Sequence, residues 1–192
     1  MNTHTVSTHA VEQTSAQLPQ LVARPAGTRL GIALVAVGLL LAAPGVKAQT
    51  KLATADNDFI LAAAQGGMTE VKLGELAAQK GVRDDVKAFG QLMVTDHSAI
   101  NADLKALAAQ KDVALPDNLD AKHQAMVDEL ADLTGAKFDD AYIAAMVKDH
   151  QMDVRDFTAE SAATKDAEIK SFVDKAIPVV NGHLQRITAM KK

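Results

Sequence analysis

Hydrophobic residues recur along most of the chain with the three- and four-residue spacing of an amphipathic helix. The clearest run consists of Val86, Phe89, Met93, His97, Ile100, Leu104 and Leu107. A run near the end of the chain consists of Ile169, Val173, Ala176, Val180, His183, Ile187 and Met190. Shorter runs cover 59–77 and 143–157. Because this spacing places side chains on one helical face, the sequence predicts four long helices with one buried face each.

The two halves of this helical region resemble each other at an offset of 83 residues. Phe59-Ile60 corresponds to Tyr142-Ile143, and Val86-Lys87-Ala88-Phe89 corresponds to Ile169-Lys170-Ser171-Phe172. Such a duplication predicts two related helical hairpins that pack as a pseudo-symmetric bundle.

A long connection, roughly 110–137, joins the two hairpins and contains a short amphipathic segment that we expect to begin at Pro116-Asp117. A long crossover is typical of ferritin-like bundles. The sequence therefore predicts an all-α fold, a ferritin-like four-helix bundle over residues 56–192. Pro178 predicts a kink or break in the last helix.

Residues 1–48 follow a different pattern. Arg24 and Arg29 precede an uncharged apolar run of 14 residues at 30–43, and Val46-Lys47-Ala48 ends as a signal cleavage site does. A membrane anchor is the alternative, but a spanning helix needs roughly 20 apolar residues. We therefore expect a signal peptide with a long leader at 1–48, a short linker at 49–55, and a periplasmic or otherwise extracytoplasmic protein. No integral membrane span should remain after cleavage.

Composition removes several classes of function. Hydrophobic residues make up 48% of the chain and aromatic residues only 3%, which favours a helical core over sheets. The formal charge of −4 argues against nucleic acid as a partner. The absence of cysteine excludes disulfides and thiolate metal sites. The pattern leaves a homo-oligomer open and identifies no protein partner.

Three of the four predicted long helices carry a histidine on the buried face, namely His97, His150 and His183, and the first helix carries Glu70. Counted from the hairpin turns, all four positions fall near the middle of their helices. A carboxylate and three imidazoles that converge inside a bundle suit a transition metal such as iron, manganese, zinc or copper. The alternative is a set of buried histidines satisfied by hydrogen bonds, as we expect for His123 in the crossover.

Oxygen ligands could come from the third long helix. Asp153 and Glu160 lie on the flank next to the line of His150, and could bind a metal or orient an imidazole. The alternative is an exposed helix surface. Asp96 and Asp149 directly precede a histidine and so point about 100° away from it, which predicts capping, salt bridges or solvent contact.

The pentapeptides Met93-Val-Thr-Asp-His97 and Met146-Val-Lys-Asp-His150 are near copies of each other. Each places a thioether one turn before an imidazole, which would suit Cu(I) or, more remotely, a b-type haem. Methionine at helical spacing is more often core filler, so that interpretation stays beside the first.

The sequence also allows a test for di-iron chemistry. Di-iron bundles carry Glu-x-x-His on two helices, whereas Val94, Val147 and Val180 stand three residues before the histidines here. The chain also shows no nucleophile–base pair and no phosphate-binding loop. No catalytic residue is predicted, and an enzyme is not favoured.

As a set, several of these residues resemble a ferritin-like family of exported bacterial proteins known as domain of unknown function 4142, whose members are often labelled outer membrane proteins. The resemblance covers 56–190, and its marks are Glu70 after Gly66-Gly67, Met93-Val-x-Asp-His97, Phe138-Asp-x-x-Tyr142, His150, Glu160, and Ile177-Pro178 before His183-Leu184. It implies a ferritin-like fold and an extracytoplasmic location, but no established activity. By analogy with the ferritin-like superfamily, it implies Glu70, His97, His150, Glu160 and His183 as metal ligands. The helical periodicity does not fit the alternating strands of a membrane barrel.

Three hypotheses follow from the sequence. The first is a periplasmic bundle that binds one or two transition-metal ions through buried Glu and His side chains. The second is a metal-free structural or stress-related bundle with a buried histidine network. The third and weakest is an oxidoreductase with a di-metal centre.

Overall fold

The computed structural model describes residues 51–191, which form five α-helices and no strand. The helices are α1 (Thr54–Lys80), α2 (Asp84–Gln110), α3 (Ala121–Ala131), α4 (Gly135–Ala163) and α5 (Ala167–Ala189). The all-α prediction is confirmed, while the relation to ferritins stays a prediction. The expected signal peptide at 1–48 lies outside the described residues. Within them, no helix is both long enough and apolar enough to cross a bilayer.

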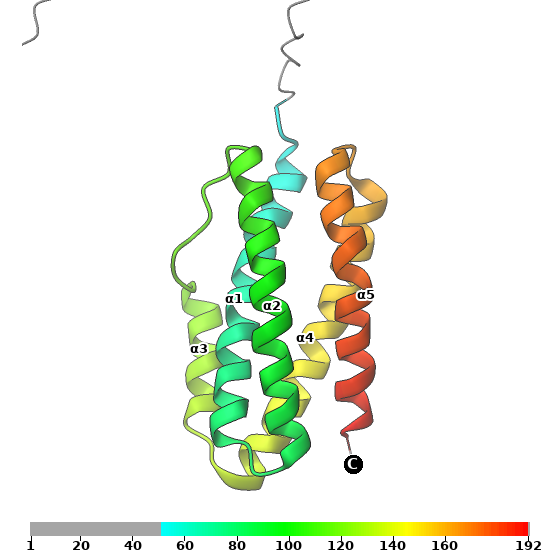
Figure 1. The fold of residues 1–192 in the computed structure, drawn as a ribbon. Helices are drawn as coiled ribbons and strands as arrows, with labels where there is room; N and C mark the ends of the chain where they lie inside the picture. Colours follow the sequence, from blue (N-terminus) through cyan, green and yellow to red (C-terminus); the bar gives the residue numbers. More distant parts are fainter. Residues whose placement is uncertain (1–50, 192) are drawn as a thin grey trace, which may run out of the picture. The chain divides into compact units, whose positions relative to one another are not determined.

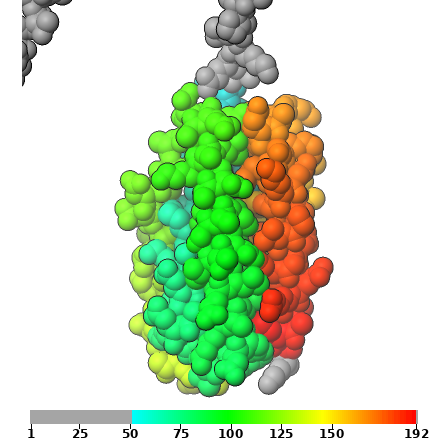
Figure 2. All heavy atoms as spheres, in the orientation of Figure 1, coloured from blue at the N-terminus to red at the C-terminus, as the bar shows by residue number. Residues whose placement is uncertain are grey.

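The four long helices form two antiparallel hairpins whose turns lie at opposite ends of the bundle (Figure 1). The crossover takes the chain back to the end of the bundle where α2 begins. The helices α2 and α4 therefore run in one direction and α1 and α5 in the other (Figure 1). The hairpins meet where α1 packs on α4 and α2 packs on α5. Figure 2 shows α2 and α5 side by side on one face. The short helix α3 packs outside the bundle against α1 and α4.

Two details of the crossover and of α5 differ from the expectations. The helix α3 begins at Ala121 rather than at Pro116-Asp117, because Asp120 supplies the N-cap and accepts a hydrogen bond from the backbone N–H of His123. The helix α5 continues through Pro178, so the predicted break is not found. Buried Val173, Ala176 and Val180 pack on both sides of the proline and hold the helix together.

Contacts between helices fix the position of the first hairpin. Gly74 and Gly90 let α1 and α2 approach closely, since a Cβ atom at Gly90 would lie only 2.6 Å from the carbonyl oxygen of Gly74. At the turn below them, the buried Asp139 of α4 accepts backbone N–H bonds from Val82 and Arg83 at 3.0 and 2.8 Å. This carboxylate holds the start of α2 against the second hairpin.

The apolar core is divided into two clusters by a polar layer. One cluster lies toward the α1–α2 turn and includes Leu73, Ala77, Phe89, Met93, Phe138, Tyr142, Met146 and Ile187. The other lies toward the α4–α5 turn and includes Ile60, Ala64, Leu104, Phe157, Ile169, Phe172 and Val173. Each long helix passes from one cluster to the other at a buried polar residue: Glu70, His97, His150 and His183. A buried polar layer costs stability unless its groups are paired by hydrogen bonds.

Candidate metal centre

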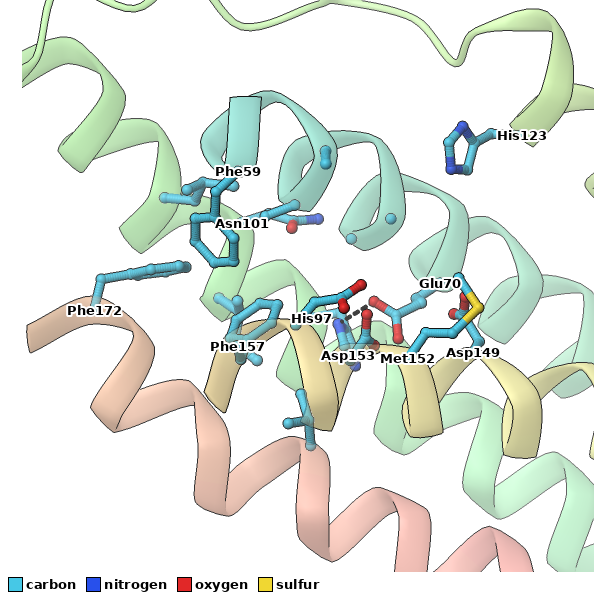
Figure 3. Close-up of a pocket in the computed structure, with 18 of the residues that line it drawn as sticks. Phe59, Glu70, His97, Asn101, His123, Asp149, Met152, Asp153, Phe157 and Phe172 are labelled. Atoms are coloured by element: carbon cyan, nitrogen blue, oxygen red, sulfur yellow. Dashed lines mark ion pairs between the residues drawn. The ribbon is translucent and has the colours of Figure 1, made fainter. Parts of the chain in front are cut away.

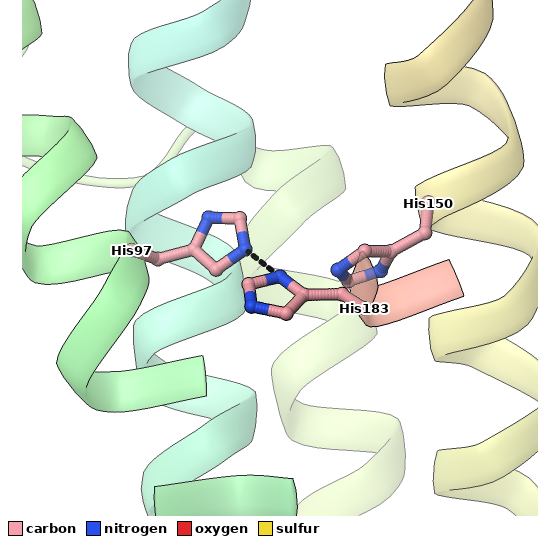
Figure 4. A group of neighbouring side chains, drawn as sticks. All are labelled: His97, His150 and His183. Carbon is pink, nitrogen blue, oxygen red and sulfur yellow. Dashed lines mark hydrogen bonds between the residues drawn. The ribbon is translucent and has the colours of Figure 1, made fainter. Parts of the chain in front are cut away.

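A chain of hydrogen bonds runs through the polar layer from the surface to its centre. The carboxylate of Asp96 accepts a bond from Nε2 of His183 at 2.8 Å. With Nε2 of His183 as the donor, its Nδ1 is the acceptor, and it faces Nε2 of His97 at 3.3 Å (Figure 4). Nδ1 of His97 lies 2.7 Å from Oε2 of Glu70. Hydrogen bonding thus fixes the orientation of two of the three imidazoles.

The third imidazole is held by the backbone and leaves one nitrogen without a partner. Nδ1 of His150 lies 3.0 Å from the carbonyl oxygen of Met146, so this nitrogen must donate. Nε2 of His150 is then the unprotonated nitrogen, and it has no hydrogen-bond partner. It faces Oε1 of Glu70 at 3.6 Å, and that oxygen has no partner either. Two buried polar atoms at the centre of the layer are therefore unsatisfied.

Burial keeps the layer uncharged. It lowers the pKa of His97 and of His183, and it lowers the pKa of His150 to about 3. Burial, with the nearby charge of Asp149, raises the pKa of Glu70 well above its ordinary value. Both shifts favour the neutral pair, in which Glu70 donates its O–H to Nδ1 of His97, over the ion pair.

A carboxylate group adjoins the histidines. Single ligand atoms of Glu70, Asp149, His150 and Asp153 lie within 4.8 Å of one another, as do single nitrogens of the three histidines. Burial raises the pKa of Asp149 and of Asp153, and for Asp153 the charges of Glu70 and Asp149 raise it further. The two groups share His150, so they form neighbouring parts of one polar site.

A pocket of about 200 Å³ reaches the site from the surface (Figure 3). Its inner wall includes Glu70, His97 and Asp153, and its apolar end is formed by Phe59, Phe157 and Phe172. Lys122, His123 and Met152 line it as well. An ion or a small molecule in the pocket can therefore reach Glu70 and His97, and the neighbouring Asp149 and Asp153.

A profile of the family described as a domain of unknown function, DUF4142, matches residues 41–190. The chain belongs to the DUF4142 family. This confirms the resemblance that the sequence showed. No curated protein matches this DUF4142 chain.

Several solved structures share the fold of the DUF4142 chain. A DUF305 fragment from Deinococcus radiodurans superposes with a TM-score of 0.64 at 11% identity, over 73% of this chain and 97% of that one. CopM in its Cu(I)-bound form has a TM-score of 0.59 at 20% identity, and in its Cu(II)-bound form 0.60 at 21%. Both CopM comparisons cover 70% of this chain and 93% of that one. At these identities the similarity shows the fold alone.

The structure brings four of the five predicted ligands of the DUF4142 chain together and leaves one apart. Glu70, His97, His150 and His183 all lie in the polar layer. Glu160 does not join them, because it lies ten residues after His150 on α4, about 15 Å along the helix axis. It faces Asp56 instead, and burial together with that neighbour raises the pKa of Glu160 to about 7.

The two aspartates next to histidines behave differently from each other. Asp96 accepts a hydrogen bond from His183 on another helix, close to the expected salt bridge. The expectation was wrong for Asp149, which lies in the carboxylate group rather than at the solvent. His123, expected to be structural, bonds to Asp120 at 2.8 Å and also lines the pocket.

Sequence reasoning missed one polar group near the site. The hydroxyl of Tyr142 is buried without a hydrogen-bond partner, and burial together with the charge of Glu70 raises its pKa. Tyr142 precedes His150 by eight residues on the same face of α4. That spacing was the signal that could have pointed to it.

Proposed function

We propose that this protein is an exported helical bundle that binds a transition-metal ion through His97, His150 and His183. One observation carries the proposal: each imidazole has one nitrogen held from outside the histidine group, while its other nitrogen faces another imidazole or has no partner. The anchors are Oε2 of Glu70 for His97, the carbonyl oxygen of Met146 for His150, and Oδ2 of Asp96 for His183. A hydrogen-bond acceptor on the second ring nitrogen is the usual support of a metal-binding histidine.

Distances within the site support the same proposal. Nε2 of His97 and Nδ1 of His183 lie 3.3 Å apart. Two nitrogens bound at about 2.05 Å to one tetrahedral ion are separated by about 3.3 Å. Nε2 of His150 completes a set of three and has no competing partner in the described structure. Since His97 lines the pocket, water or another small ligand would reach the fourth position from the side of His97.

Metal binding requires one proton to leave the polar layer. In the metal-free layer, His97 donates from Nε2 to His183 and Glu70 donates to Nδ1 of His97. For Nε2 to become a ligand, His97 must carry its proton on Nδ1 and donate it to an ionised Glu70. The carboxyl proton of Glu70 is then released, which makes Glu70 an orienting partner of His97 rather than an obligatory ligand.

A site of three imidazoles favours copper and zinc over manganese, since nitrogen ligands suit the former and oxygen ligands the latter. The fold shared with CopM, solved in Cu(I)-bound and Cu(II)-bound forms, supports copper as the first ion to test. Export is supported by the signal pattern at 1–48.

The proposal is tested by calorimetric titration of chelator-stripped mature protein with Cu²⁺ and Zn²⁺. We expect one ion to bind per chain with release of about one proton at pH 7. His150→Phe should abolish this binding, whereas His123→Phe, at the rim of the pocket, should preserve it. Equal binding by both variants would refute the proposal.

The metal-free structural bundle remains the second candidate because a specific observation favours it. The chain of bonds from Asp96 through His183 and His97 to Glu70 is complete without an ion. If the titration detects no binding of either ion, the layer is a hydrogen-bonded network that positions the four helices. The oxidoreductase hypothesis has no Glu-x-x-His pair to support it.

A further inference from the structure

The carboxylate group beside the histidines has features that the proposed histidine site does not use. Glu70, Asp149 and Asp153 come from α1 and α4 and converge at the inner end of the pocket (Figure 3). From this group the histidine site uses only Oε2 of Glu70 and the shared His150. Oε1 of Glu70 and both carboxylates of Asp149 and Asp153 have no role in the histidine site.

Two buried, unpartnered groups point into this cluster. Glu70 is 2% exposed and its Oε1 has no hydrogen-bond partner, and His150 is fully buried with an unpartnered Nε2 3.6 Å away. Oδ2 of Asp153 is also buried without a partner. Leaving buried acceptors unpaired is unfavourable, and more so when they are charged. A positive ion among these oxygens would remove that cost.

The duplication of the hairpins places two of these carboxylates at equivalent positions. At the offset of 83 residues, Glu70 of α1 corresponds to Asp153 of α4. The two equivalent acids face each other where the hairpins meet, and Asp149 adds a third from one turn earlier on α4. Glu70 and Asp153, which occupy equivalent positions in the two hairpins, therefore form the centre of the carboxylate group.

We propose that Glu70, Asp149 and Asp153 form a second cation position that adjoins the histidine group and takes a divalent ion preferring oxygen ligands, such as Mn²⁺. With Oε2 of Glu70 turned toward His97, the three carboxylates supply up to five oxygens, and the pocket admits water to complete an octahedral shell. Glu70 lies between the two positions, with Oε2 toward His97 and Oε1 toward the second ion. This position extends the proposed metal site but does not require the histidine position to be filled.

Electron paramagnetic resonance of Mn²⁺ tests the second position directly, because bound Mn²⁺ loses the sharp six-line signal of the free ion. We expect one Mn²⁺ to bind per mature chain, both in the natural protein and in a variant with His97→Gln and His183→Gln. Asp149→Asn and Asp153→Asn should each weaken binding more than about tenfold. Asp156→Asn is the matched control, because Asp156 lines the same pocket from the same helix but is exposed.

The outcomes separate this inference from the proposed function. Absence of Mn²⁺ binding in the natural protein would overturn it, as would equal binding in the Asp149, Asp153 and Asp156 variants. Binding that disappears only in the histidine variant would also overturn it, since Mn²⁺ would then occupy the histidine site. If Cu²⁺ and Zn²⁺ do not bind but Mn²⁺ does, only the proposed function fails. Circular dichroism confirms folding, and each aspartate variant is decisive alone if the other does not fold.

Discussion

Replacing His150 by glutamine should change how the stability of the metal-free protein depends on pH. Burial lowers the pKa of His150 to about 3 in the folded protein, from 6.5 in the unfolded chain. As the pH falls through 6.5, the unfolded chain binds a proton that the folded protein does not, so folding is disfavoured. Integrated from pH 8 to pH 5, this difference costs the natural protein about 2 kcal/mol.

The comparison with the variant is needed because other groups act in the opposite direction. The folded-state pKa values of Glu70 and Asp153 are raised, so these acids stabilise the fold as the pH falls toward the pKa values of the unfolded chain. The natural protein alone therefore shows the sum of opposing effects. Subtracting the pH profile of the His150→Gln variant leaves the contribution of one imidazole.

Urea denaturation at pH 8, 7, 6 and 5 with a chelator present gives the required free energies of unfolding. The stability of His150→Gln relative to the natural protein should rise by about 2 kcal/mol between pH 8 and pH 5. Val173→Ala serves as the control, because it removes buried methyl groups from the other end of the core without changing a titratable group. A difference that stays constant with pH for His150→Gln would refute the buried, neutral state of this residue.

Three further predictions concern other parts of the bundle. Asp96→Asn should weaken metal binding by about tenfold in a calorimetric titration, since it removes the charge that orients His183, while Asp103→Asn on the same helix should not. Glu160→Gln should raise the free energy of unfolding at pH 8 by about 1 kcal/mol in urea denaturation, because the raised pKa of Glu160 makes its ionised form unfavourable in the folded protein. This gain should vanish near pH 4.5, where Glu160 is protonated in the folded protein. Gly90→Ala should cost about 3 kcal/mol by the same method, because its Cβ atom would meet the backbone of α1.

The positions of the buried histidines could be predicted from the sequence because helical geometry determines them. A spacing of three and four residues placed His97, His150 and His183 on buried faces, and counting from the hairpin turns placed them at one level with Glu70. The structure confirms both features, since each of these residues separates the two apolar clusters. The same helical geometry could have excluded Glu160 from the predicted ligands, because it lies ten residues after His150 on one helix.

The carboxylate group could not be predicted in the same way, because it depends on which flank of the bundle is covered. Asp96 and Asp149 occupy the same place in near-identical pentapeptides. The helix α3 packs against α1 and α4, so Asp149 lies in the pocket that Lys122 and His123 of α3 help to line. Asp96 instead lies on α2, where it reaches His183 of the neighbouring α5. One local motif therefore serves two purposes.

The hydrogen-bond partners that hold the imidazoles could not be predicted from the sequence either. Which ring nitrogen faces the centre depends on side-chain rotation, and the decisive partners are a backbone carbonyl at Met146 and a carboxylate at Asp96. Helical periodicity specifies the face of a residue but not the rotamer of its ring.

Metal content of the exported protein, purified without an affinity tag or chelator, tests the central claim most directly. Inductively coupled plasma mass spectrometry should find about one copper or zinc ion per chain, and none in a variant with His97, His150 and His183 all replaced by glutamine. A protein that contains no metal and takes up neither copper nor zinc after incubation with their salts would contradict the claim.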